Sequence, residues 1–181
     1  MTRPDTVIFE PMDVHHIAQI LDIENRSFST PWSAISFRNE IFNPDGIAFV
    51  AVPGPARNEA GFEANPKGDN PQESPARSET GPAKAILGYI CAECRLGEGH
   101  ILNVAVHPAH RRRGLARFML RAVLEEMRKR GCYTVYLEVR MSNTAAVRLY
   151  EEAGFRQTGR RKLYYVRPFE DAVLMQLEMK D

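Results

Sequence analysis

Residues 111–117 combine side chains and a backbone pattern that could bind phosphate groups. They are Arg-Arg-Arg-Gly-Leu-Ala-Arg and stand between an apolar stretch that ends at Pro108 and a series of apolar residues at helical spacing. Gly114 would let the backbone pass close to a ligand, and the first N–H groups of the following helix lack partners inside that helix. These donors, the positive end of the helix dipole and the arginines favour a phosphate site. A basic helix start on a solvated surface is the alternative.

Glu138 is a second candidate, because it interrupts the apolar stretch Val-Tyr-Leu-Glu-Val at 135–139. Such a stretch is typical of a strand that is covered on both faces. A carboxylate there must be paired, must have a raised pKa, or must belong to a functional site. The alternative to a functional site is an ion pair with Arg140 or with another arginine at the edge of the sheet.

Asn143 and Tyr150 follow Glu138 closely in the chain, and each also has an ordinary structural explanation. Asn143 precedes a short predicted helix, where asparagine is a good N-cap. Tyr150 lies two turns into that helix and could be a core residue. The residues alone leave these alternatives open.

The hydrophobic pattern predicts the strands and helices that position these residues. Strands are expected at 7–9, 47–52, 85–92, 101–106, 134–139, 155–163 and 172–179. Helices are expected after Asp13, after Ser33, from Leu115 to a C-terminal Gly131, and from Asn143 to Gly154. This order predicts an α/β fold in which a mixed sheet has helices on both faces, within a single domain that spans 1–181.

Residues 53–84 differ in composition from the rest of the chain. They hold six of the twelve prolines and four of the twelve glycines, with few large apolar side chains. Such a segment cannot bury enough apolar surface to offset the entropy that it would lose on ordering. We expect it to be a disordered loop inserted between two strands.

The overall composition excludes some classes of protein. With 181 residues, 44% hydrophobic and 26% charged, the chain is typical of a globular protein, and its net charge of +1 differs from the basic balance of nucleic-acid-binding domains. The first ten residues lack the apolar core of a signal peptide, and no apolar run approaches the ~20 residues of a membrane span. We therefore expect a cytoplasmic protein that neither enters a membrane nor binds nucleic acid directly.

The cysteines raise the question of a metal or redox site. Cys91 and Cys94 form a C-x-x-C pattern, but residues three apart in a strand point to opposite faces. The sequence has no second cysteine pair or His-x-His cluster that would complete a zinc site. We expect ordinary buried or half-buried thiols at both positions and no metal site.

Several of these segments together resemble the GNAT acetyltransferase superfamily. Residues 111–116 match its Arg/Gln-x-x-Gly-x-Gly/Ala loop, with Ala116 at the position of the second loop glycine. Leu-Glu-Val-Arg-Met-Ser-Asn (137–143) and Leu-Tyr-Glu-Glu-Ala-Gly-Phe (149–155) resemble its carboxyl-terminal motifs, most closely those of the RimI branch. Shorter matches are Phe-Ser-Thr-Pro-Trp-Ser (28–33), Asn-Val-Ala-Val (103–106), and Tyr164-Tyr165 followed by Glu170-Asp171-Ala172. The resemblance covers nearly the whole chain outside 53–84.

This resemblance implies a mostly antiparallel GNAT sheet and an enzyme that uses acetyl-CoA as its cosubstrate. RimI proteins acetylate the N-terminal alanine of a small-subunit ribosomal protein, so the implied partner is a protein N-terminus. Glu138 is the implied base, directly or through water, and Tyr150 the implied acid for the departing thiolate. The residues implied to hold acetyl-CoA are Val104, Ala105, Val106, Arg112, Arg113, Gly114, Leu115, Ala116, Arg117 and Asn143. Those implied to hold the acceptor are Trp32, Tyr164 and Tyr165, although the two tyrosines could simply pack on a hairpin.

Other functions remain compatible with the sequence. The acceptor could be a small-molecule amine, because the acetyl-CoA half of the site does not specify it. A non-catalytic acyl-CoA sensor is a further alternative, although the presence of both Glu138 and Tyr150 argues against it. An RNA-binding module could use the short basic runs at 111–113, 128–130 and 160–162, but the near-zero net charge predicts only weak, salt-sensitive binding.

Overall fold

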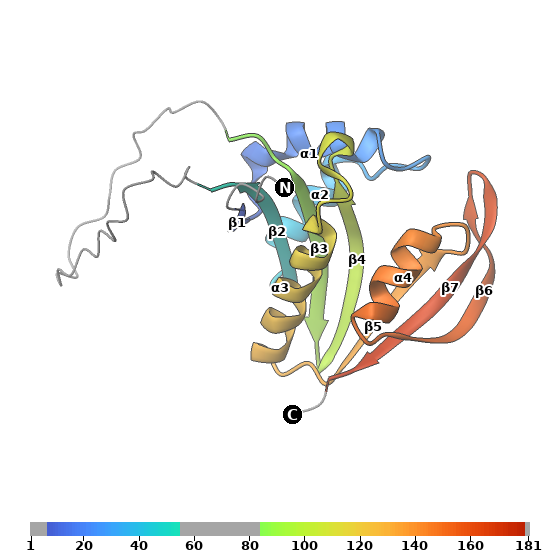
Figure 1. The fold of residues 1–181 in the computed structure, drawn as a ribbon. Coiled ribbons are helices and arrows are strands. Elements are labelled where there is room, and N and C mark those ends of the chain that lie inside the picture. The colour runs from blue at the N-terminus through green and yellow to red at the C-terminus, as the bar shows by residue number, and fades with distance from the viewer. Residues whose placement is uncertain (1–6, 55–83, 180–181) are drawn as a thin grey trace.

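The protein is described by a computed structural model that covers residues 7–54 and 84–179 (Figure 1). The segment 53–84, for which we expect disorder, lies outside the described residues except at its two ends. Pro53 closes a strand, and Lys84 forms an ion pair with Glu10. In the part of the chain that is described, no helix is both long enough and apolar enough to cross a membrane.

The order of strands and helices is the one expected from the sequence. The strands are β1 (Val7–Pro11), β2 (Gly46–Pro53), β3 (Gly88–Arg95), β4 (Glu98–Val106), β5 (Thr134–Arg140), β6 (Arg156–Val166) and β7 (Phe169–Glu178). The helices are α1 (Ile17–Asn25), α2 (Ala34–Phe42), α3 (Leu115–Lys129) and α4 (Thr144–Glu152), with short 3-10 helices at Val14–His16 and Pro108–His110. One boundary differs in a way that matters for the site: β6 extends to Val166, so Tyr164 and Tyr165 lie in the strand and not in the connection that follows it.

The strands form one sheet in the order β1-β2-β3-β4-β5-β7-β6. Only β4 and β5 are parallel neighbours, and the other adjacent pairs are antiparallel. The expectation of a mixed, mostly antiparallel α/β sheet is therefore confirmed.

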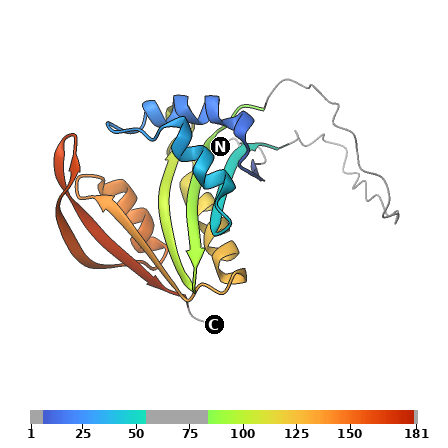
Figure 2. The same ribbon diagram turned by 180° about the vertical axis from the view of Figure 1, so that it is seen from behind.

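Helices cover both faces of this sheet. On one face, α3 buries the apolar side that its spacing predicts, including Met119, Val123 and Met127, and α4 lies on the same side (Figure 1). On the opposite face, α1 and α2 pack Ile20 and Phe37 over β2 and β3 (Figure 2). Burial of this apolar surface on both sides fixes the sheet between two helical layers.

The parallel strands β4 and β5 separate after a short paired region. They pair from Glu98–Thr134 to Ile101–Leu137, and then β4 continues beside β3 while β5 continues beside β7 (Figure 1). Leu102 is an extra residue on β4, because Cys91 of β3 pairs with Asn103 and the next β3 residue pairs with Ile101. Such a bulge bends its strand and increases the local twist. The bulge therefore lies at the point where β4 leaves β5.

We call the region where β4 and β5 are no longer paired, beyond Ile101 and Leu137, the opening. A buried polar cluster ties α1 to β3 and to this part of β4. Glu24 is 1% exposed and accepts hydrogen bonds from the Tyr89 hydroxyl, from Asn103 Nδ2 at 3.2 Å and from the backbone N–H of Trp32 at 2.8 Å. Burial and the neighbouring carboxylate both raise the pKa of Tyr89, so its hydroxyl stays a donor. Because a buried carboxylate must be satisfied by such donors, this cluster fixes the end of the loop between α1 and α2.

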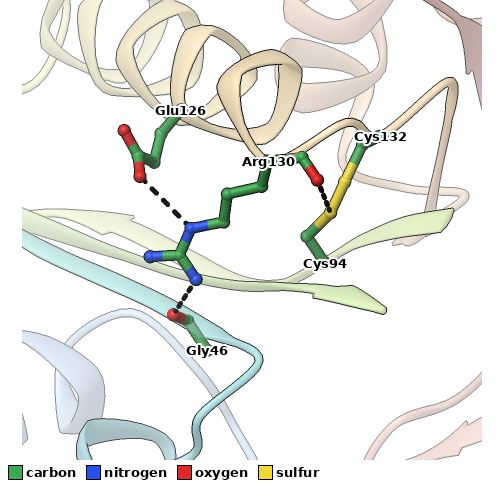
Figure 3. The surroundings of a disulfide bond; sticks show 5 residues. All are labelled: Gly46, Cys94, Glu126, Arg130 and Cys132. Carbon is green, nitrogen blue, oxygen red and sulfur yellow. Dashed lines mark hydrogen bonds and ion pairs between the residues drawn. A yellow bond between two sulfur atoms is a disulfide. The ribbon is translucent and has the colours of Figure 1, made fainter. Parts of the chain in front are cut away.

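The expectation of ordinary thiols at Cys91 and Cys94 is wrong for Cys94. Cys94, at the end of β3, forms a disulfide with Cys132 in the loop between α3 and β5, with 6.3 Å between the Cα atoms (Figure 3). Arg130, the residue after α3, bonds Gly46 of β2 at 2.9 Å and Glu126 at 3.2 Å, which holds the end of this helix against the sheet. The sequence-based reasoning considered only the nearby pair Cys91 and Cys94. The partner of Cys94 is Cys132, which lies 38 residues further along the chain, just after α3. Cys91 is the buried free thiol that we expect, and its burial raises its pKa.

Candidate functional site

The start of α3 has the geometry of an anion site. Arg112 and Gly114 both have left-handed backbone conformations, with φ of 61° and 80°, and α3 begins immediately afterwards at Leu115. A Cβ at Gly114 would meet nothing within 4 Å, so the glycine is required by its backbone conformation and not by lack of space. Glycine offers no side chain to cap the helix, and no acidic residue occupies its first turn. The first N–H groups of α3 are therefore available to phosphate oxygens.

The arginines around this loop differ in what they contact. Arg111 turns back and bonds the carbonyl of Val106 at 3.0 Å and the hydroxyl of Ser27 at 2.9 Å. The Arg117 guanidinium pairs with Glu152 of α4, across a cavity of about 640 Å³ between α3 and α4. All four arginines are exposed, and among the described residues Arg112 and Arg113 are the two that form no ion pair or side-chain hydrogen bond.

The edge of β4 that faces β5 carries the second part of the candidate site. Within the described chain no strand pairs with this edge beyond Ile101. Ala105 and Val106 are buried and Val104 is half-buried, so this edge is firmly held by the core behind it. Backbone N–H and C=O groups on a strand edge can bind an extended ligand as a neighbouring strand would.

Glu138 is the first residue of β5 beyond the last pair with β4. Its side chain is 17% exposed, and its two carboxylate oxygens contact His100 Nε2 at 2.7 Å and Arg161 Nη1 at 3.5 Å. The alternative given for Glu138, an ion pair with an arginine at the edge of the sheet, is therefore present, and the partner is Arg161 of the edge strand β6. The strand is also not covered on both faces, because Tyr136 is 36% exposed.

His100 is a partner of Glu138 that the sequence did not reveal. It lies on β4, one residue before the end of the paired region, and its partner Glu138 is 38 residues further along the chain. No local pattern marks such a histidine, since only the register of two parallel strands brings the two side chains together.

Tyr150 and Asn143 keep both of the explanations that the sequence allows. Tyr150 is 8% exposed and its ring packs edge-on against Phe155 at 5.7 Å, as a core residue does. Burial, with a smaller contribution from Tyr165, raises the pKa of Tyr150 to about 12, so the hydroxyl carries its proton at neutral pH. Asn143 is indeed the N-cap of α4, and its Oδ1 accepts the N–H of Ala146 at 3.1 Å.

The aromatic residues assigned to the acceptor belong to the α1–α2 loop and to the β6–β7 hairpin, and we call these two segments the walls of the opening. Trp32 belongs to the α1–α2 loop and packs against Phe37 at 5.4 Å between ring centroids. Tyr164 and Tyr165 lie edge-to-face at 5.0 Å on β6, with Tyr164 exposed and Tyr165 half-buried. Burial raises the pKa of Tyr165 to about 12, so this hydroxyl is also neutral and can donate a hydrogen bond. The aromatic packing foreseen as an alternative is present, and it leaves the Tyr164 ring accessible.

Known proteins resemble this chain in sequence and in fold. The acetyltransferase (GNAT) family model matches residues 17–155. The [ribosomal protein bS18]-alanine N-acetyltransferases of Salmonella typhimurium and Escherichia coli K12 are 44% identical to this chain over 94 residues, which are 51% of this chain and 64% of each relative. The match thus spans less than two thirds of those relatives. A putative enzyme of the same name from Bacillus subtilis is 24% identical over 91% of this chain and 90% of its own length.

Solved structures agree in fold. The ribosomal-protein-S18-alanine N-acetyltransferase from Escherichia coli superposes with a TM-score of 0.73 and 26% identity, covering 97% of this chain and 96% of that one. Arabidopsis thaliana NAA60 in complex with acetyl-CoA gives a TM-score of 0.74 over 96% of this chain and 99% of that one, at 19% identity. With a family model that matches most of the chain and this agreement in fold, the chain belongs to the GNAT acetyltransferase family.

Proposed function

We propose that this protein transfers the acetyl group of acetyl-CoA to the N-terminal α-amine of a protein. The position of Glu138, at the point where β4 and β5 separate, carries the proposal, because it puts a carboxylate beside an open strand edge. The names of the relatives that are 44% identical point to the N-terminal alanine of ribosomal protein bS18 as the acceptor. Such an acceptor implies action in the cytoplasm.

Acetyl-CoA fits the features of the opposite half of the site. Its pyrophosphate would bind the backbone N–H groups of 112–117, together with the side chains of Arg112 and Arg113. The contribution of Arg117 is limited to its N–H, since its guanidinium pairs with Glu152. The pantetheine would lie along Val104–Val106, and Asn143 would help to hold it. When bound, acetyl-CoA supplies the activated acyl group.

Glu138 acts as the base for the acceptor amine. An ammonium has no lone pair, so it must lose one proton before the neutral amine attacks the thioester carbonyl, and the nitrogen loses a second proton as the amide forms. An N-terminal α-amine has an ordinary pKa near ~8, so a carboxylate that accepts the proton directly or through water is sufficient near neutral pH. The contacts to the half-buried His100 and to Arg161 hold the carboxylate in place.

Tyr150 acts as the acid at the end of the reaction. The C–S bond of the thioester breaks as the amide forms, and the thiolate of CoA then takes a proton. A buried tyrosine whose pKa is about 12 holds this proton at neutral pH and can give it to the thiolate. Cys91, Cys94 and Cys132 have no part in this scheme, because direct attack needs no acetylated enzyme.

The proposed function is tested by turnover with a panel of acceptors. An alanine-starting peptide with the bS18 N-terminal sequence should be acetylated, whereas the same peptide with a blocked N-terminus, free lysine and a polyamine should not. Turnover of the small amines alone would replace the protein acceptor with a small-molecule one. Tight binding of acetyl-CoA without any turnover would instead indicate a non-catalytic sensor.

Replacement of the base should slow the chemistry and spare acetyl-CoA binding. We expect Glu138→Gln to lower kcat about 10²-fold or more, the usual contribution of general base catalysis, with the Kd of acetyl-CoA unchanged. The pH dependence of kcat/KM should change as well. Glu125→Gln, at an exposed position of α3, is the matched control and should behave as wild type. A pH–rate profile that Glu138→Gln leaves unchanged would remove Glu138 from the role of base.

Tyr150→Phe should likewise reduce kcat and leave acetyl-CoA binding intact, because it removes only the hydroxyl. Since the pKa of Tyr150 is about 12, the wild-type hydroxyl keeps its proton as the pH rises and loses it only in strong alkali. Below about pH 10, loss of this proton should therefore not lower the kcat of the wild type, and the alkaline parts of the two pH–rate profiles should have the same shape. Tyr133→Phe, which alters an exposed tyrosine, is the control. Wild-type turnover by Tyr150→Phe would contradict the assignment.

A further inference from the structure

Arg140 is the last residue of β5 and lies two positions after Glu138. Its side chain is 19% exposed, and the guanidinium donates to acceptors in three separate parts of the chain. These acceptors are Glu170 Oε2 on β7 (3.2 Å), the carbonyl oxygens of Arg167 (3.0 Å) and Pro168 (3.3 Å) in the β6–β7 turn, and Ser29 Oγ in the α1–α2 loop (3.2 Å). The guanidinium thus joins the strand that holds Glu138 to both walls of the opening.

Direct contacts between those walls reinforce the arrangement. The Ser29 hydroxyl donates to the carbonyl of Arg167, so the α1–α2 loop touches the β6–β7 turn. Both segments lie at the same end of the molecule in the two opposite views (Figures 1 and 2). Without Arg140, the carbonyl groups at this junction would lose a charged donor that holds them in one geometry.

Arg140 also fixes the carboxylate and the aromatic ring beside it. The second oxygen of Glu170 accepts the N–H of Ser142, which lowers the pKa of Glu170 and keeps it ionised against Arg140. The Arg140 Cζ atom lies 4.1 Å from the centroid of the Tyr165 ring, within the range of a cation–π contact. A planar guanidinium can serve all these partners at once, whereas a lysine ammonium on a flexible stem cannot.

We propose that Arg140 is the positioning residue of the acceptor site. It holds the α1–α2 loop, the β6–β7 turn and Tyr165 at a fixed distance from Glu138, and it thereby sets how tightly an extended peptide N-terminus binds. Arg140 itself contacts none of the reacting atoms. This inference rests on the proposed function, because it takes the opening between these walls as the peptide site.

The test compares Arg140→Gln and Arg140→Lys with Arg156→Gln, which removes the same charge from an exposed position of β6. We expect Arg140→Gln to raise the KM for the alanine-starting peptide about tenfold or more, with a smaller change in kcat and with the Kd of acetyl-CoA within about twofold of wild type. Arg140→Lys should fall between Arg140→Gln and wild type, since the ion pair with Glu170 can survive. Arg156→Gln should match wild type.

A second variant keeps the test decisive if Arg140→Gln folds poorly. Ser29→Ala removes both contacts of the α1–α2 loop at this junction, the one to Arg140 and the one to the Arg167 carbonyl, and we expect it to raise the peptide KM about threefold. In the double variant with Arg140→Lys the two effects should not add, because both substitutions act through the same junction. An unchanged peptide KM in Arg140→Lys and Ser29→Ala, or an equal rise in the Kd of acetyl-CoA, would overturn the inference. Absence of peptide turnover in the wild type would instead refute the proposed function itself.

Discussion

The early end of hydrogen bonding between β4 and β5 is the constraint on which the candidate site depends. In a continuous sheet, β5 would occupy the edge of β4 from Leu102 onward, and the backbone of Glu138 would pair with that edge. The extra residue at Leu102 bends β4, and the antiparallel partners on either side, β3 and β7, then carry β4 and β5 apart. The same separation leaves one edge of β4 unpaired and places Glu138 at the point where the two strands part.

The two halves of the opening are held by different kinds of interaction. On the side that we propose for acetyl-CoA the fixed elements are backbone features: the uncapped start of α3, the left-handed Gly114 and the edge of β4. On the side that we propose for the acceptor the α1–α2 loop depends on side chains. Glu24 accepts a hydrogen bond from the N–H of Trp32 at the end of this loop. Arg111 and Arg140 donate hydrogen bonds to the hydroxyl groups of Ser27 and Ser29 in the same loop. Arg111 belongs to the segment that precedes α3, so the loop on the acceptor side is physically connected to the site expected for the pyrophosphate.

The features that the sequence predicted are those that depend on neighbouring residues. The caps at Ser33 and Asn143, the glycine before α3 and the helix periodicity all act within a few positions, and the structure confirms them. Glu138 was recognisable because a carboxylate in an apolar strand is costly to bury unless it is paired. The features that sequence reasoning missed depend on strand register and on contacts between residues far apart in the chain. His100 meets Glu138 only through a parallel pairing, Cys132 meets Cys94 only after α3 has crossed the sheet, and Arg140 meets Ser29 from 111 residues away.

Hydrogen exchange of the backbone amides with and without acetyl-CoA tests the central claim most directly, because that claim concerns an open strand edge. If the edge of β4 and the start of α3 receive the cosubstrate, its addition should slow exchange of amides within 102–106 and 112–117, while β1 and β2 on the far side of β3 should be unchanged. Acetyl-CoA binding that leaves the amides of 102–106 unaffected would contradict the account, because the separation of β4 from β5 would then not form the binding site.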